Sequence, residues 1–302
     1  MAEITVRDAK LFYTERGAGD AVVFVHGGLS DYRAWEAQLD PIGARYRAVS
    51  YSRRYGWPNQ PIADGADDQL DPHVEDLAAF LRALDLAPAH LVGNSTGAFV
   101  ALLLACRQPE LVRTLVLEEP PVLPLWVSAQ PRPAELLALL ARRPRSFITL
   151  MRLFATGIGP AVKAFRRGDM ETGLRVFATA LEGRETFARR AARPGGPMRA
   201  NVKVLAASLL GAGFPSFSAA DARSVKVPVL LLNGTASPAI NHRLSDALAE
   251  VLPNVERVRI PRASHHMHED EPRAVNDAIL GFLVKHPAAE GLAPRLLEVS
   301  AR

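Results

Sequence analysis

The chain has 302 residues, of which 48% are hydrophobic and 23% charged, so it can bury the core of one large domain or of a domain with an insertion. No apolar run is long enough to cross a bilayer, and the N-terminus lacks the basic and then apolar pattern of a signal peptide. We therefore expect a cytoplasmic protein without a membrane partner. The single cysteine, Cys106, excludes an intramolecular disulfide and a cluster of thiolate metal ligands.

Charge is unevenly distributed along the chain. The net charge is +4, yet the segment 120–223 has 16 basic and 6 acidic residues, a net of +10. Such a segment could attract an anionic substrate, but we favour the interpretation that the arginines only keep the helices solvated and dock against acidic loops. No basic stripe is interleaved with aromatic residues, and no zinc or helix-turn-helix signature is present, so we expect no nucleic-acid partner.

Short β-branched runs alternate with helical periodicity, which indicates βαβ units and an α/β fold with a mostly parallel sheet flanked by helices. The first two predicted strands would form an antiparallel pair. Strands are predicted at 3–7, 10–14, 21–25, 46–50, 90–92, 114–118, 227–232 and 255–260. Helices are predicted near 34–39, 72–84, 96–107, 241–251 and 272–285.

The alternation of strands and helices stops at Pro120 and resumes only at Ser224. The intervening segment has helical periodicity and is rich in Ala, Leu and Arg. We interpret it as a helical lid inserted between two strands. The predicted organisation is a core formed by 1–119 and 224–286, a cap at 120–223, and a frayed, Pro- and Ala-rich tail at 287–302.

A serine between two glycines stands between an apolar run at 89–92 and a second one at 98–105, in the sequence Gly-Asn-Ser-Thr-Gly at 93–97. A Gly-x-Ser-x-Gly turn between a strand and a helix exposes the serine hydroxyl on a sharp, strained bend. The pattern alone is weak, and its position between strand and helix strengthens it. We therefore predict that Ser95 is a nucleophile.

A serine nucleophile needs donors for the oxyanion that forms when it attacks a carbonyl. The predicted strand at 21–25 leads into His-Gly-Gly at 26–28, where small residues let backbone N–H groups face an incoming oxygen. We predict an oxyanion hole made by the N–H groups of Gly28 and Thr96. The His26 side chain is expected to be structural.

A serine nucleophile also needs a base. His265 lies in the loop that follows the last predicted strand and precedes the helix opening at Pro272, where parallel-sheet enzymes place functional side chains. We predict His265 as the base. His266 and His268 are interpreted as exposed or hydrogen-bonded loop residues.

Two consecutive glutamates at the end of the predicted strand 114–118 are candidates for the acid that orients the histidine. Neighbouring side chains on a strand point to opposite faces, so only one of the two can face His265. We favour Glu119, because Pro120 and Pro121 end the strand there and direct the chain toward the lid. Glu118 is the reserve candidate.

Together, the His-Gly-Gly loop, the serine turn, the helical insertion and the histidine loop resemble the α/β-hydrolase superfamily from about residue 4 to residue 283. In that family the acid commonly stands in a turn after the next strand, where this chain has Ser237. Haloalkane dehalogenases and some lactone hydrolases of the family place it after the sixth strand, which Glu119 matches. Dehalogenases and epoxide hydrolases use an aspartate where this chain has Ser95, so neither activity is expected.

The resemblance implies a serine hydrolase of carboxylic esters or lactones, acting on a small-molecule substrate without metal or organic cofactor. Alternatives are hydrolysis of a carbon–carbon bond and ligand binding without catalysis, the latter because of Ser237. The segment 51–58 departs from the family's Asp-x-Arg-Gly-x-Gly-x-Ser loop, and Tyr55 or Trp57 could line the pocket. Trp126 of the lid is a third candidate for substrate contact, although most apolar lid residues are expected to pack within the lid.

Overall fold

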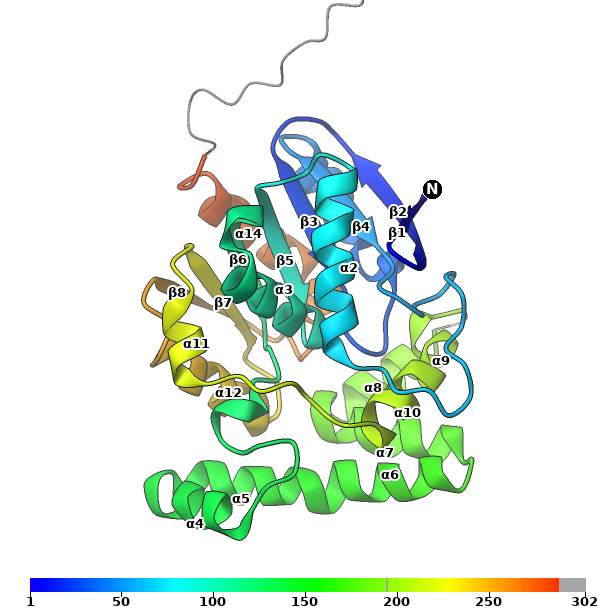
Figure 1. Cartoon of the computed structure of the whole chain (residues 1–302), viewed down its shortest axis with the longest axis vertical. Coiled ribbons are helices and arrows are strands. Elements are labelled where there is room, and N and C mark those ends of the chain that lie inside the picture. The colour runs from blue at the N-terminus through cyan, green and yellow to red at the C-terminus, as the bar shows by residue number, and fades with distance from the viewer. Residues whose placement is uncertain (194, 288–302) are drawn as a thin grey trace, which may run out of the picture.

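The structure is a computed structural model that describes residues 1–193 and 195–287. Its centre is an eight-stranded sheet with the strand order β1-β2-β4-β3-β5-β6-β7-β8 (Figure 1). β1 pairs antiparallel with β2, and β2 antiparallel with β4; the remaining neighbours are parallel. The strands are β1 (Ala2–Val6), β2 (Ala9–Arg16), β3 (Ala21–Val25), β4 (Arg47–Tyr51), β5 (Ala89–Asn94), β6 (Val112–Glu118), β7 (Val229–Gly234) and β8 (Val255–Ile260).

Both faces of the sheet are covered, which confirms the predicted α/β architecture. In β3, Val23 and Val25 pack into one apolar cluster while Val22 and Phe24 pack into a second one on the opposite face. This alternation follows from the two-residue period of a strand. α2 (Leu70–Ala83), α3 (Thr96–Arg107) and α12 (Ala239–Ala249) cover the first face, and α1 (Glu36–Gly43) and α14 (Pro272–Leu283) cover the second.

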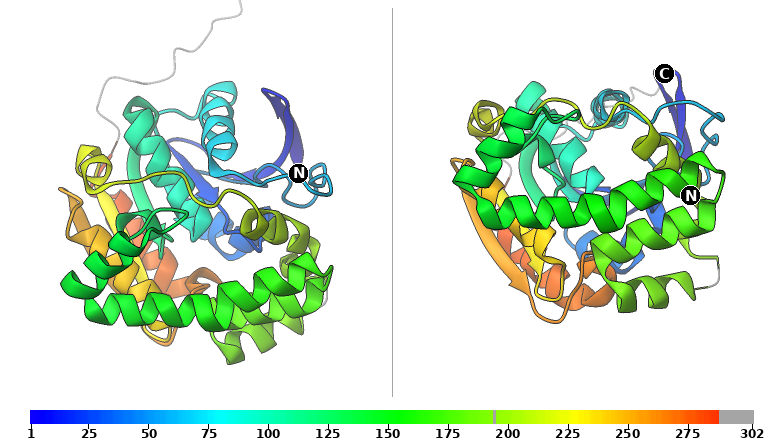
Figure 2. Two further views of the ribbon diagram at one scale, coloured as in Figure 1. Left: turned by 60° about the horizontal axis from the view of Figure 1, so that its bottom comes forward. Right: turned by 90° about the horizontal axis from the view of Figure 1, so that it is seen from below.

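Between β6 and β7 the chain leaves the sheet and forms a series of helices that lies across the carboxyl ends of the strands (Figures 1 and 2). We call this segment, 120–223, the helical insertion. A separate apolar cluster holds its middle together, around Ala161, Phe165 and Leu174. Its α-helices are α4 (Pro133–Arg142), α5 (Pro144–Leu153), α6 (Gly159–Arg166), α7 (Met170–Glu182), α8 (Arg184–Ala191), α9 (Pro197–Ala200), α10 (Val202–Leu210) and α11 (Ala219–Ser224).

The end of the helical insertion returns to the sheet before residue 224. Phe217 and Ala222 are buried in the main apolar cluster beside α3. Cys106, at the end of α3, is only partly buried, and burial raises the pKa of its thiol to about 11. The expected frayed tail falls, apart from residue 287, outside the described residues. None of the described helices is long and apolar enough to span a membrane.

Candidate active site

Ser95 occupies a sharp turn between β5 and α3, with φ of 50° and ψ of −122°. Residues other than glycine rarely adopt this backbone conformation. The flanking glycines permit this turn. A Cβ on Gly97 would lie 2.2 Å from the carbonyl oxygen of Val25, and a Cβ on Gly93 would lie 2.6 Å from the Cα of Ala98. The turn brings Ser95, a partly exposed residue, to the edge of the sheet where β3 ends.

The loop after β3 is held in place by its own histidine. His26 Nδ1 lies 2.8 Å from the carbonyl oxygen of Gly27, and His26 Nε2 accepts the backbone N–H of Arg53 at 2.8 Å. Burial, together with the nearby Arg53 guanidinium, holds the pKa of His26 well below its usual range, so the ring is neutral. The loop thereby carries Gly28 to the cavity that Thr96 also lines.

His265 and Glu119 form a buried pair in which His265 Nδ1 lies 2.7 Å from Glu119 Oε2. The other carboxylate oxygen of Glu119 accepts the backbone N–H of Gly234 at 3.1 Å and lies 3.4 Å from Nδ2 of Asn233. The amide of Asn241 lies 3.3 Å from His265 Nδ1. With Nδ1 engaged by the carboxylate, His265 Nε2 is the nitrogen left to take a proton.

Glu118 pairs with a different histidine. Its Oε2 lies 2.6 Å from His268 Nδ1, and the His268 ring stacks on Trp35 with 4.3 Å between ring centroids. Asn94, the residue before Ser95, donates from Nδ2 both to Glu118 Oε2 at 3.2 Å and to the carbonyl oxygen of His265 at 3.0 Å. His268 is thus buried and hydrogen-bonded in the core, whereas His265 lines the cavity.

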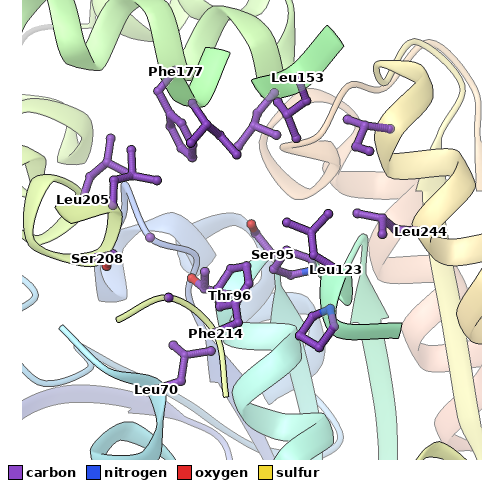
Figure 3. Close-up of a pocket in the computed structure, with 18 of the residues that line it drawn as sticks. Leu70, Ser95, Thr96, Leu123, Leu153, Phe177, Leu205, Ser208, Phe214 and Leu244 are labelled. Atoms are coloured by element: carbon purple, nitrogen blue, oxygen red, sulfur yellow. The ribbon is translucent and has the colours of Figure 1, made fainter. Parts of the chain in front are cut away.

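The cavity has a volume of about 350 Å³ and lies between the sheet edge and the helical insertion (Figure 3). Ser95, Thr96, Gly28, His265 and Glu119 all line it. Most of its wall is apolar, contributed largely by the helical insertion and α12. The larger apolar side chains include Leu153, Phe177, Leu205, Phe214 and Leu244.

The three aromatic residues expected to bind substrate are not among the residues that line this cavity. Trp126 packs inside the helical insertion, although its neighbours Leu123 and Val127 reach the cavity wall. Trp57 is 41% exposed and lies under the guanidinium of Arg33 on the outer surface. Tyr55, in the same loop, is also absent from the lining. The sequence shows aromatic character but not which side of a loop faces inward.

The structure adds polar residues to the cavity that sequence reasoning missed. Arg53 and Asp68 line it from the loops after β4, and Ser208 lines it from α10. Glu182 and His266 line the cavity as well. Arg53 stands in the segment 51–58 whose departure from the family pattern was visible, and only the tertiary contacts show that it reaches the cavity.

A buried charge cluster joins the helical insertion to the histidine loop. Arg190 Nη1 lies 2.7 Å from Glu182 Oε2 and 2.8 Å from His266 Nε2. Burial and the positive charge of Arg190 lower the pKa of His266 to about 4. His266, His268 and Glu269 lie close enough together to be considered as metal ligands, but the Arg190 guanidinium already supplies the cation there. We therefore assign no metal to this cluster.

Comparison with known proteins gives the family. The model of the "Alpha/beta hydrolase family" matches residues 22–278, and the chain belongs to this family of hydrolases. The chain is 26% identical over 292 residues to a haloalkane dehalogenase of Mesorhizobium japonicum, covering 93% of this chain and 90% of that protein. It is 38% identical over 95 residues to the non-heme chloroperoxidase CPO-A1 of Kitasatospora aureofaciens, covering 31% of this chain and 34% of that protein.

Several of the first curated relatives are matched over less than half of their own length. Among solved structures, a thermophilic esterase from Thermogutta terrifontis superposes with a TM-score of 0.70 at 23% identity, over 95% of this chain and 99% of that one. This likeness establishes the shared fold. The relatives' names cover several reactions, so the reaction of this chain has to be argued from its own site.

Proposed function

We propose that this protein hydrolyses carboxylic esters or lactones of small molecules through an acyl-enzyme, with Ser95 as nucleophile, His265 as base and Glu119 as the acid that orients the histidine. The observation that carries the proposal is the 2.7 Å contact between His265 Nδ1 and Glu119 Oε2, in a cavity that Ser95 also lines. A carboxylate on Nδ1 holds the imidazole in the tautomer whose Nε2 can accept a proton, and it stabilises the imidazolium that results.

The reaction divides into two balanced halves. In the first, Ser95 Oγ attacks the ester carbonyl while His265 Nε2 takes the hydroxyl proton, and His265 then returns that proton to the departing alkoxide. In the second, a water molecule attacks the acyl-enzyme, His265 takes a proton from the water, and Ser95 leaves with that proton. The N–H groups of Gly28 and Thr96 would stabilise the oxyanion in both halves, each contributing about 3 kcal/mol.

The position of Glu119 bears on the alternative of ligand binding without catalysis. That alternative was motivated by Ser237, which stands where the family commonly has the acid. The Ser237 hydroxyl is buried and has no hydrogen-bond partner among the described residues, and Ser237 does not line the cavity. Since Glu119 already supplies a carboxylate to His265, the serine at 237 is no longer a reason to expect an inactive protein.

The decisive experiment measures hydrolysis of 4-nitrophenyl esters, from acetate to octanoate, by the wild type, Ser95→Ala and the matched control Ser237→Ala. We expect kcat/KM to fall by about 10⁴-fold or more in Ser95→Ala, because the nucleophile is removed, and to change little in Ser237→Ala. Labelling with a fluorophosphonate should likewise require Ser95 and not Ser237.

Three results would count against the proposal. Ester turnover that survives in Ser95→Ala would remove the serine mechanism. Absence of ester turnover and of fluorophosphonate labelling in the wild type would favour a ligand-binding protein. Turnover of a vinylogous 1,5-diketone together with inactivity on every ester would favour carbon–carbon hydrolysis.

A further inference from the structure

Arg53 is a buried cation beside the proposed oxyanion hole. It follows β4 and is only 2% exposed. Its Nε donates to the carbonyl oxygen of His26 at 3.0 Å, and its Nη2 lies 3.3 Å from both the carbonyl oxygen of Gly27 and Oγ1 of Thr96. Three of its five N–H groups are therefore directed at the loops that carry Gly28 and Thr96.

The remaining guanidinium nitrogen, Nη1, is buried and has no hydrogen-bond partner within residues 1–193 and 195–287. Arginine stays protonated in proteins, so Nη1 carries two donor hydrogens on a charged group. A buried donor without an acceptor destabilises a protein, so this nitrogen calls for a partner that the protein itself does not supply. Arg53 is among the residues that line the cavity, and Nη1 is the one nitrogen of its side chain that has no protein acceptor in the described structure.

The acidic group on the same side does not satisfy this nitrogen. Asp68 lines the cavity as well, but its Oδ1 lies 2.7 Å from His73 Nε2 and its Oδ2 accepts the hydroxyl of Ser208 at 2.6 Å. No hydrogen bond joins Asp68 to Arg53 in the described structure. The negative charge of Asp68 offsets the charge of Arg53 at a distance, yet both of its oxygens are already engaged.

The surroundings of Arg53 make its free donors selective. Leu70, Leu205 and Phe214 line the same cavity as Arg53, together with Ser208 (Figure 3). A cation among apolar side chains discriminates strongly between a ligand that supplies an acceptor and one that supplies a methyl group. A carboxylate matches the planar donor geometry of a guanidinium better than other common ligand groups.

We propose that Arg53 forms a subsite for a carboxylate on the acyl portion of the substrate, so that the preferred substrates are half-esters or lactones bearing a carboxylate. This inference rests on the proposed esterase function and deepens it. Thr96 follows Ser95 directly and contacts the Arg53 guanidinium, so the subsite lies next to the scissile carbonyl. A short spacing between carboxylate and ester carbonyl is therefore expected.

The first test compares charged and neutral substrates of matched length: 4-nitrophenyl half-esters of malonate, succinate and glutarate against the corresponding propanoate, butanoate and pentanoate esters. We expect the wild type to prefer the charged member of at least one pair by about ten- to hundredfold in kcat/KM, as a charge-assisted hydrogen bond provides. Arg53→Gln should abolish this ratio, whereas Arg53→Lys should retain part of it.

The ratio isolates recognition of the carboxylate from the support that Arg53 gives to the oxyanion loop, because damage to that loop slows both members of a pair alike. Arg199→Gln is the matched control. It removes the same charge from an exposed arginine of α9 and should leave the ratio unchanged. If Arg199→Gln or 0.5 M salt removes the preference as fully as Arg53→Gln does, surface charge attracts the substrate and the subsite is refuted.

A second measurement does not depend on folding of an Arg53 variant or on ester turnover. Monomethyl glutarate and methyl pentanoate are titrated calorimetrically into Ser95→Ala, which keeps Arg53 in place. We expect the half-ester to bind at least tenfold more tightly. Equal affinities would refute the subsite and indicate that water satisfies Nη1. If the half-ester binds more tightly to Ser95→Ala while the wild type itself hydrolyses no ester, the subsite is kept and the proposed function is rejected.

Discussion

Two histidine–carboxylate pairs stand side by side in this molecule, and they differ in what surrounds them. Glu118 and Glu119 are consecutive at the end of β6, and each contacts Nδ1 of a histidine in the segment between β8 and α14, at 2.6 and 2.7 Å. His265, the partner of Glu119, lines the cavity with Ser95. His268, the partner of Glu118, stacks on Trp35 in the core. Access to the cavity, and not the pair itself, separates a proposed catalytic role from a structural one.

The largest difference between the pairs should appear when each carboxylate is made neutral. Glu119→Gln should lower kcat on 4-nitrophenyl esters by about 10²- to 10⁴-fold. The imidazolium of His265 loses its counter-charge, and the neutral imidazole loses the carboxylate that fixes its tautomer. Glu118→Gln is the matched control and should stay within about tenfold of the wild type. Equal losses in the two variants, measured on protein of verified fold, would contradict the division of roles.

The two variants should rank in the opposite order for stability, with the larger loss of unfolding free energy in Glu118→Gln. Glu118→Gln should lower the free energy of unfolding by about 1–3 kcal/mol, because a buried hydrogen bond to a charged group is weakened. Its carboxylate also accepts from Asn94, which is bonded to the carbonyl oxygen of His265. Urea unfolding of the two glutamine variants measures this directly. A greater loss of stability in Glu119→Gln than in Glu118→Gln would overturn the ranking.

The core pair should also respond to pH. Burial alone would lower the pKa of His268, but the Glu118 carboxylate raises it above the ordinary value of 6.5. The folded protein therefore holds this proton more tightly than the unfolded chain. The contribution to stability is fully present below about pH 6.5 and is lost as pH rises through the folded pKa.

Unfolding of the wild type and Glu118→Gln at pH 6 and pH 9 tests this sign. The difference in unfolding free energy between the two proteins should be larger at pH 6 than at pH 9. A difference that is unchanged or larger at pH 9 would mean that protonated His268 is not what Glu118 stabilises.

The smallest expected effect is a partial recovery of kcat when an aspartate at another position replaces the carboxylate lost in Glu119→Gln. In Glu119→Gln, Asn241→Asp should restore part of kcat, because the Asn241 amide already lies 3.3 Å from His265 Nδ1. Ser237→Asp in the same background should restore less, since the Ser237 hydroxyl makes no contact with His265 among the described hydrogen bonds. A gain of about tenfold from Asn241→Asp is expected in ester assays. Better rescue by Ser237→Asp would show that the turn after β7 can still present an acid to the histidine.

The choice between the two glutamates was partly visible in the sequence. Alternation along a strand requires that Glu118 and Glu119 point to opposite faces, and the following prolines favoured Glu119 as the partner of His265. The sequence held no sign that Glu118 would find a second histidine. His268 lies 150 residues away in the chain, and its burial against Trp35 depends on how the histidine loop packs on the helices of the second sheet face.

Local patterns in the sequence determined the strands, the flanking helices, the position of the helical insertion and the strained turn at Ser95, because hydrophobic period, glycine and proline act over a few residues. The tertiary structure alone decided which side chains face the cavity. Trp57 was expected there and lies on the surface. Arg53, four residues earlier, lines the cavity and has one nitrogen without a partner among the described residues. Which face of a loop turns inward depends on contacts between distant segments, here His26 and Thr96 with Arg53, and no local pattern in the chain records them.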